Sequence, residues 1–188
     1  MTKLNTICSA NDSLLLIIDI QAKLLSAIPE QDAALMLANS GTLITAAEIL
    51  DIPIFLTEQY PKGLGRTDPL ILEKLPETTR SFEKTGFSCC AAENFCQTLT
   101  KNASKQIILV GQETHVCVLQ TAIELLNLGY QVYVVEDAVC SRKPSHKNNA
   151  LQRLQHQGVI ISNYESVLFE WLKDANHPQF KTISKLIH

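Results

Sequence analysis

Cys117 occupies the position in this sequence where a thiol has the strongest reason to be reactive. The preceding residues 107–110 (IILV) are apolar and mostly β-branched, which predicts a buried strand. Apolar residues then recur at helical spacing over 116–128, and Gly129 follows as a C-cap. Open parallel sheets bind ligands where their strands end, and a helix N-terminus stabilises a thiolate. The sequence therefore predicts that Cys117 is a nucleophile with a lowered pKa.

A carboxylate and an amine elsewhere in the chain could supply the rest of the chemistry. Asp19 lies at the end of the apolar run 14–20 (LLLIIDI), where a carboxylate is costly to bury without a partner or a task. Lys84 lies within residues 81–88 (SFEKTGFS). A thiol, a carboxylate and an ammonium group together suffice for attack on a carbonyl carbon. Taken singly, Asp19 could instead cap a turn, and Lys84 could be a solvated surface residue.

The three residues lie in three short motifs that follow one another along the chain. They are Ile-Asp-Ile-Gln, Glu-Lys-Thr-Gly-Phe-Ser and Gly-Gln-Glu-Thr-His-Val-Cys-Val. With them the chain resembles the isochorismatase-like hydrolase family from about Leu14 to about Trp171. Residues 57–65 (TEQYPKGLG) resemble the isochorismatase-domain-containing subgroup of that family.

The resemblance implies a role for each residue of a catalytic triad. Cys117 attacks an electrophilic carbonyl carbon, and Asp19 takes the thiol proton, returns it to the leaving group and then activates water. Lys84 keeps Asp19 ionised and oriented. The backbone N–H groups of Glu113 and Cys117 form an oxyanion hole, and the Gln112–Glu113 peptide bond is cis.

Four further residues are candidate walls of a substrate pocket: Gln21, Gln59, Tyr60 and Phe87. Residues 58–79 have no clear period and are too long for an ordinary connection, so we expect them to form a wall or lid over the site. Tyr60 and Phe87 could equally pack against this long segment.

No metal or other cofactor is expected. Nicotinamidases of the resembled family hold a metal with an aspartate and histidines that follow the second strand, and residues 58–66 here contain no histidine. No CxxC spacing is present either. The histidines, none with the spacing of a metal site, are His115, His146, His156, His177 and His188. The cysteines interpreted as small buried hydrophobic residues are Cys8, Cys89, Cys90, Cys96 and Cys140.

Composition is typical of one α/β domain spanning residues 1–188. The chain of 188 residues is 46% hydrophobic but only 6% aromatic, which favours an aliphatic core. A net charge of −3 argues against a dedicated nucleic-acid partner. No apolar stretch is long enough to span a bilayer or resembles a secretory leader. We therefore expect a cytoplasmic protein with a small-molecule substrate and no membrane partner.

Strands and helices are predicted to alternate, which favours three layers, α/β/α, around a central, mainly parallel six-stranded sheet. The expected strands are 14–20, 54–57, 80–82, 106–110, 131–135 and 159–161. The expected helices are 32–50, 91–101, 116–128 and 145–157, with terminal helices from Tyr164.

Together these features predict a metal-independent cysteine hydrolase. Its substrate is a small amide, carbamoyl or related C–N compound, cleaved through a thioester-type intermediate on Cys117. One alternative is an isochorismatase-type enol-ether hydrolase that uses Asp19 and Lys84 while Cys117 only lines the pocket. The other is a catalytically idle, oligomeric interaction or ligand-sensing protein.

The C-terminal part predicts assembly into a homo-oligomer. Residues 167–172 are nearly continuous in bulky apolar side chains, and Phe180, Ile183, Leu186 and Ile187 recur at roughly helical spacing. Since a monomer rarely exposes so much clustered apolar surface, we expect part of it to be buried against another copy. The alternative is that these helices fold back onto their own sheet.

Overall fold

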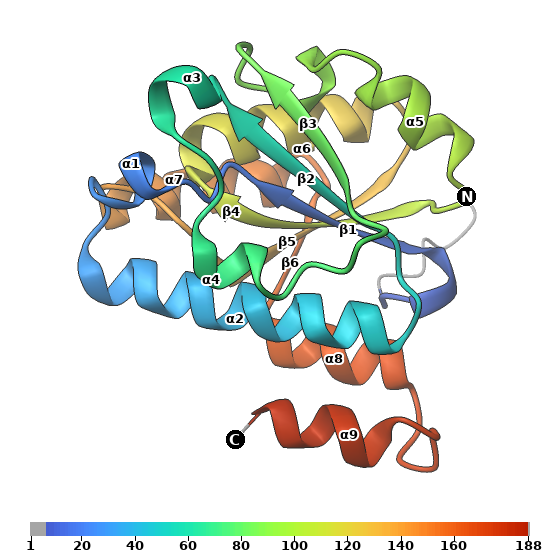
Figure 1. The fold of residues 1–188 in the computed structure, drawn as a ribbon. Helices are drawn as coiled ribbons and strands as arrows, with labels where there is room; N and C mark the ends of the chain where they lie inside the picture. Colours follow the sequence, from blue (N-terminus) through green and yellow to red (C-terminus); the bar gives the residue numbers. More distant parts are fainter. Residues whose placement is uncertain (1–6, 188) are drawn as a thin grey trace.

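The computed structural model describes residues 7–187 and places a six-stranded sheet at the centre of this part of the chain (Figure 1). The strand order is β3-β2-β1-β4-β5-β6, and all five strand pairings are parallel. The predicted fold class is therefore confirmed. The strands are β1 (Ser13–Ile18), β2 (Ile54–Gln59), β3 (Arg80–Lys84), β4 (Gln106–Gln112), β5 (Gln131–Cys140) and β6 (Ile160–Ser162).

Helices cover both faces of the sheet (Figure 1). One face is covered by α2 (Glu30–Ile49), α8 (Tyr164–Leu172) and α9 (Phe180–Ser184). The other is covered by α5 (Phe95–Lys101), α6 (Leu119–Asn127) and α7 (Pro144–His156). The short helices α1 (Ala22–Leu25), α3 (Pro61–Leu64) and α4 (Pro69–Leu72) lie in connections. No helix in the described part of the chain has the length and apolar character needed to cross a membrane.

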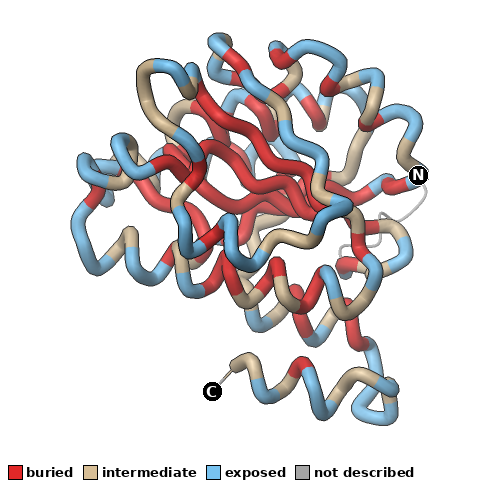
Figure 2. The backbone as a smooth tube through the Cα atoms, in the orientation of Figure 1, coloured by how far each residue is buried: buried red, intermediate tan, exposed pale blue. Residues whose placement is uncertain are grey.

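The core forms as two apolar layers because alternate residues of a strand point to opposite faces of a sheet. Leu15 and Ile17 of β1 pack in the layer shared with α2 and α8, whereas Leu14 and Leu16 pack in the layer under α5 and α6. The central strands are buried along almost their whole length (Figure 2). Burial on both faces explains why β1 is a continuous apolar run.

Several predicted strand boundaries were wrong because the polar residues near the strand ends were misread. β1 stops at Ile18, and Asp19 follows with a φ of 51°, in the left-handed region. β2, β3 and β4 instead run on to Gln59, Lys84 and Gln112. β5 likewise continues past the predicted residue 135 to Cys140, with a register shift against β4. The polar side chains at the ends of β2, β3 and β4 find internal partners, so these strands continue.

The helices also differ from the prediction at their N-terminal ends. Residues 91–101 do not form one helix: a 3₁₀ turn (Cys89–Ala91) comes first, and α5 begins after Asn94, whose φ is 61°. The helix predicted over 116–128 begins earlier, as a π-helical turn (Thr114–Val118) that leads into α6. Residues 58–79 contain the end of β2 together with α3 and α4.

The C-terminal helices fold back onto their own sheet, so the reasoning behind the predicted oligomer was wrong. The Trp171 indole N–H donates a hydrogen bond of 3.0 Å to Ser13 Oγ on β1, deep in the core. Phe169 remains 42% exposed and is the exception on α8. The side chains buried within the chain are Val167, Leu168, Trp171, Leu172 and Ile183, and those packed against them are Phe180, Leu186 and Ile187. Homo-oligomerisation stays a prediction without this support.

Candidate active site

The predicted triad and Gln59 come from four neighbouring strands and meet at one edge of the sheet. Asp19 follows β1, Gln59 ends β2, Lys84 ends β3, and Cys117 lies in the π-helical turn that follows β4. Because all four strands are parallel, their carboxyl ends lie at the same edge, where ligands bind in open α/β folds. The structure thus brings together side chains that are as many as 98 positions apart in the sequence, from Asp19 to Cys117.

Asp19 is fully buried, and its carboxylate oxygens and backbone oxygen all accept hydrogen bonds. Its Oδ2 accepts a hydrogen bond of 2.7 Å from Lys84 Nζ, and its Oδ1 accepts one of 2.8 Å from Thr57 Oγ1. Its backbone oxygen accepts from Gln21 N at 2.9 Å and from Gln112 Nε2 at 3.1 Å. A buried carboxylate is tolerated only with such partners, and these fix both its position and its orientation.

Gly111 on β4 allows the backbone to come close to β1 just before Asp19. Its φ is +112°, and a Cβ atom at this position would lie 2.1 Å from the carbonyl oxygen of Ile18. No other residue type fits so near a neighbouring strand with this backbone conformation. The glycine therefore fixes the separation between the strand that precedes Asp19 and the strand that precedes Cys117.

Lys84 supplies a buried cation whose hydrogens all have acceptors. Its Nζ donates to Asp19 Oδ2 at 2.7 Å and to Gln59 Oε1 at 2.6 Å. It also donates to the carbonyl oxygens of Phe87 at 2.9 Å and Gly86 at 3.3 Å. An ammonium group has three hydrogens to donate, and they are fully used here. Lys84 is thus a fixed positive charge beside Asp19.

Cys117 lines a cavity of about 630 Å³ and is itself only 6% exposed. Burial raises the pKa of its thiol, and the nearby Asp19 carboxylate raises this pKa further by its charge and by accepting a hydrogen bond from the thiol. The charge of Lys84 lowers it, but by less. The direction is opposite to the predicted lowering of the Cys117 pKa, because desolvation and a neighbouring negative charge both favour the neutral thiol.

A second cysteine lies behind Asp19 and does not line the cavity. Cys89 is fully buried, and its Sγ is 3.5 Å from Thr57 Oγ1, the hydroxyl that donates to Asp19. Its backbone N–H donates to Thr121 Oγ1 at 3.0 Å, on the helix that follows Cys117. Burial raises the pKa of the Cys89 thiol to about 12. Its predicted role as a small buried residue fits this setting, whereas its contact with Thr57 was not predicted.

Glu113 and Arg142 form a second ion pair next to Cys117. The Gln112–Glu113 peptide bond is cis, as the resemblance implied. The Glu113 carboxylate accepts from Arg142 Nη2 at 2.6 Å, from Arg142 Nε at 3.1 Å and from the Arg142 backbone N at 2.9 Å. Burial alone would raise the pKa of Glu113, but the hydrogen bonds and charge of Arg142 together lower it. Arg142 therefore anchors the residue that follows the cis bond.

Arg142 was missed from the sequence because β5 was predicted to end at residue 135. The strand continues through Asp137, whose backbone oxygen accepts from Asn39 Nδ2 at 2.8 Å and whose carboxylate accepts from Tyr164 N at 2.9 Å. Carried on to Cys140, the same strand would have pointed to Arg142 as a residue at the carboxyl edge.

Three of the four predicted pocket walls line the cavity: Gln59, Tyr60 and Phe87. The fourth prediction, Gln21, is corrected, since this side chain is fully buried and does not reach the cavity. Its Nε2 donates to the backbone oxygens of Gln59 and Gly65 at 3.1 and 2.6 Å, and its Oε1 accepts from Gln59 N at 2.7 Å. Gln21 thus fixes the end of β2 and the loop beyond it.

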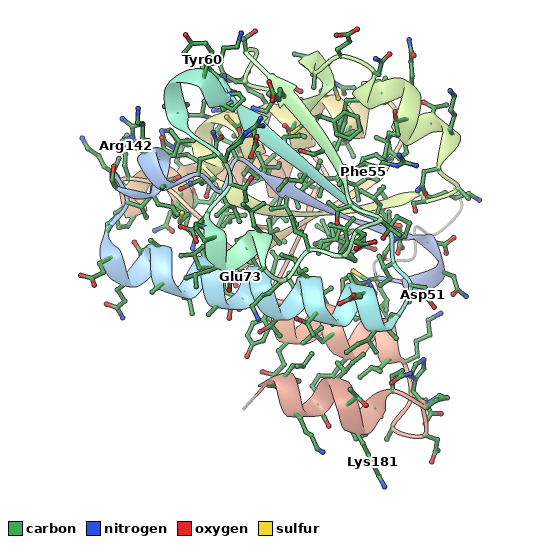
Figure 3. The ribbon with its side chains drawn as sticks, in the orientation of Figure 1. Asp51, Phe55, Tyr60, Glu73, Arg142 and Lys181 are labelled. Atoms are coloured by element: carbon green, nitrogen blue, oxygen red, sulfur yellow. The ribbon has the colours of Figure 1, made fainter. Side chains whose placement is uncertain are left out.

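Most of the remaining wall residues were not predicted from the sequence. Figure 3 labels the predicted wall residue Tyr60, beside α3, and Arg142, which was not predicted. Glu113, predicted for the oxyanion hole, also lines the cavity. The other members that were not predicted are Leu24, Leu64, Thr85 and Val116. They lie on short helices and turns, whose arrangement depends on contacts between distant parts of the chain.

His115 is adjacent to the site in sequence but faces another residue. Its Nδ1 lies 3.0 Å from Ser141 Oγ, and its ring is tilted by 50° against that of His146, with the centroids 4.7 Å apart. Burial lowers the pKa of His115. Within residues 7–187, no three or more His, Cys, Asp or Glu side chains are grouped so that they could hold a metal ion.

The chain is similar in sequence and structure to known proteins over nearly its whole length. Residues 13–166, which include the predicted triad, match the isochorismatase domain. Isochorismatase domain-containing protein 2 of Rattus norvegicus is 39% identical over 179 residues, 93% of this chain and 80% of that protein. The structure of MAR1 ribonuclease from Caenorhabditis elegans is 41% identical with a TM-score of 0.90, covering 96% of this chain and 92% of that one. YcaC from Pseudomonas aeruginosa, solved with hexane-2,5-diol and covalent acrylamide, is 26% identical with a TM-score of 0.90, covering 98% and 93%.

Proposed function

This chain belongs to the isochorismatase family of hydrolases, and from that premise we propose that it is a metal-independent cysteine hydrolase of small amides, carbamoyl compounds or related C–N substrates. One observation carries the proposal. The cysteine that lines the cavity lies beside a fully buried pair in which Lys84 Nζ and Asp19 Oδ2 are 2.7 Å apart. Burial of an isolated ion pair contributes little to stability, so a pair kept next to a thiol favours a chemical role.

In the first half of the reaction the Cys117 sulfur attacks the substrate carbonyl carbon as its proton passes to the Asp19 carboxylate. The carbonyl oxygen becomes an oxyanion, which the backbone N–H groups of Glu113 and Cys117 would stabilise. The tetrahedral intermediate collapses when Asp19 returns the proton to the leaving nitrogen. An amine or ammonia departs and leaves an acyl thioester on Cys117.

In the second half a water molecule replaces the amine. Asp19 takes a proton from this water as its oxygen attacks the thioester carbon, and the same proton then returns to the departing sulfur. A carboxylic acid is released and the thiol is restored. Lys84 takes no part in these proton transfers, since its three hydrogens are bonded to fixed acceptors, and its charge holds Asp19 in place.

The raised pKa of Cys117 favours proton transfer concerted with attack. A preformed thiolate would have to share the buried site with the Asp19 carboxylate. A thiol that donates a hydrogen bond to Asp19 avoids this repulsion and places its proton on the path to the base.

The proposal is tested with a panel of primary amides, carbamates, a vinyl ether and a short RNA, assayed with and without EDTA. The vinyl ether represents the enol-ether alternative, and the RNA is included because one similar structure is that of a ribonuclease. Arg142, the cation that lines the cavity, is already paired with Glu113, which does not favour a phosphodiester. We expect wild-type protein to hydrolyse amides equally well in EDTA.

Cys117→Ala and Cys117→Ser are expected to lose this activity, with Cys96→Ala as the matched control because Cys96 does not line the cavity. Acid quenching of the wild-type reaction should trap protein whose mass is increased by the acyl group, and hydroxylamine should remove it. Turnover of an amide by Cys117→Ala would overturn the covalent mechanism. Turnover of the vinyl ether alone, unchanged in Cys117→Ala, would establish the enol-ether alternative.

A further inference from the structure

The wall of the cavity next to Cys117 is mainly apolar. Five hydrophobic side chains line it: Leu24, Tyr60, Leu64, Phe87 and Val116. They come from α1, the start of α3, the end of α3, the turn after β3 and the π-helical turn that carries Cys117. Such a wall, formed by separate elements around one thiol, favours an apolar group in its interior.

The charged groups of the site are already paired with one another. Glu113 and Arg142 line the cavity, but three side-chain hydrogen bonds of 2.6–3.1 Å join the Arg142 guanidinium to the Glu113 carboxylate. Asp19 and Lys84 are paired behind the wall, with fully buried side chains. A charged substrate group would thus lose its water and find no unpaired opposite charge among these residues.

The two aromatic rings at the rim of the cavity are held by backbone hydrogen bonds. Tyr60 adopts a φ of 37°, and its backbone N–H donates to the carbonyl oxygen of Lys84 at 2.7 Å. Its ring covers Gly63, where an added Cβ would lie 2.3 Å from Tyr60 Cε1. On the Phe87 side, the carbonyl oxygen of Phe87 accepts from Lys84 Nζ at 2.9 Å. Lys84 therefore ties both rim residues to the triad.

These two rings remain exposed despite their fixed backbones. Tyr60 and Phe87 are each 53% exposed, and both line the cavity. Apolar rings that are held in place yet uncovered gain free energy when an apolar ligand covers them.

We propose that the acyl part of the substrate is an uncharged, apolar chain or ring of several carbons that lies against this wall. This inference rests on the proposed function, because the acyl group is the part that stays bonded to Cys117 while the amine leaves and water enters. A cavity of about 630 Å³ is within the range that accommodates such a group together with the attacking water.

The test compares acetamide, butanamide, hexanamide and 6-amino-6-oxohexanoate, which is hexanamide with a carboxylate in place of its terminal methyl group. We expect kcat/KM to rise about fourfold for each methylene that becomes buried. The carboxylate should reduce it at least tenfold relative to hexanamide, on the order of the cost of desolvating a charge without a partner. Equal rates along the series, or a preference for the carboxylate, would overturn the inference.

A binding measurement separates this inference from the proposed function. Aldehydes of the same skeletons add the Cys117 sulfur to their carbonyl carbon and move the thiol proton to the carbonyl oxygen, so no turnover is needed. Calorimetry should give hexanal a Kd at least tenfold below that of 6-oxohexanoate, as for the amides. If the aldehydes follow this order while no amide is hydrolysed, the apolar site stands and the amidase proposal fails. Aldehydes that bind without regard to chain or charge refute the apolar site.

Two variants test whether the apolar wall of the cavity causes the preference for the longer amide. Leu64→Asn and Phe87→Ser should each reduce the ratio of hexanamide to acetamide kcat/KM about fivefold, a loss of the size expected for one or two methylene contacts. Phe87 is half exposed, so its replacement leaves folding intact even if that of Leu64 does not. Leu128→Asn is the matched control, since Leu128 is 56% exposed and does not line the cavity. A ratio that moves equally in all three variants would refute the assignment.

Discussion

The carboxyl edge of the sheet and the layer formed by α8 and α9 are both well buried, but they differ in what is buried. In the helical layer the buried side chains are aliphatic or aromatic, and one indole N–H bonds to Ser13 Oγ. At the carboxyl edge the buried side chains are polar or charged: Asp19, Gln21, Thr57, Gln59, Lys84 and Gln112.

The difference separates stability from function. Burial of apolar surface stabilises a fold in proportion to its area, so the α8–α9 layer is explained by folding alone. A buried ion pair is often no more stabilising than hydrophobic residues of similar volume, so the Asp19–Lys84 pair is not explained in this way. Substitutions at the two regions should therefore affect different properties.

The largest effect is expected at the carboxyl edge. Asp19→Asn keeps the shape of the side chain but removes the base, and kcat should fall by about 10²–10⁴-fold. Steady-state kinetics on the amide found in the substrate panel would measure this, with circular dichroism to verify folding. Glu83→Gln is the matched control on β3, because its half-exposed carboxylate pairs with Arg66 away from the cavity. Full activity in Asp19→Asn would remove Asp19 from the mechanism.

Trp171→Ala is expected to produce the opposite pattern. Removing this almost fully buried indole from the α8 layer should lower the free energy of unfolding by about 3–5 kcal/mol. The kcat of the remaining folded protein should change less than twofold, because Trp171 is not part of the cavity wall. Urea denaturation and kinetics on the same samples give both quantities.

Phe169→Ala, on the same helix, is the control for Trp171→Ala. Its side chain is 42% exposed, so the loss of stability should be about 1 kcal/mol or less. Equal destabilisation by the two variants would mean that α8 packs differently from the arrangement described. A large loss of kcat in Trp171→Ala would mean that the two regions are not separable.

At both regions the sequence predicted the features that depend on neighbouring residues and missed those that depend on contacts between distant residues. Runs such as residues 14–18 reveal buried strands because burial on both faces needs continuous apolar residues. Cys117 and Lys84 were found because motifs preserve their local neighbours. Gln21 was misjudged because its partner Gly65 is distant in the chain, and only the fold shows which groups face each other. Arg142 was missed because β5 was predicted to end before it reaches the carboxyl edge, where Glu113 lies.

The Cys117 pKa illustrates the same limit. The helix start is a local feature that the sequence reveals, and it predicts a lowered value. The charge of Asp19 acts through space, across the gap between β1 and β4, and together with burial it raises the pKa. The predicted sign was wrong because the stronger effects are not local.

The smallest expected effect is also the one most sensitive to this geometry. In the wild type, alkylation of Cys117 by iodoacetamide should be slow at pH 8 and still rise as the pH passes 9, since the raised pKa keeps the thiol protonated. Asp19→Asn removes the carboxylate whose charge and hydrogen bond raise this pKa, while Lys84, which lowers it, remains. The pKa should therefore fall, and each unit of decrease gives about tenfold more thiolate at pH 8.

Peptide mass spectrometry at Cys117 should show that the variant with the lower kcat is alkylated about tenfold faster, whereas Glu83→Gln matches the wild type. Slower alkylation in Asp19→Asn would mean that Asp19 promotes the thiolate at rest, and the concerted proton transfer proposed for Cys117 would have to be replaced by attack from a preformed thiolate.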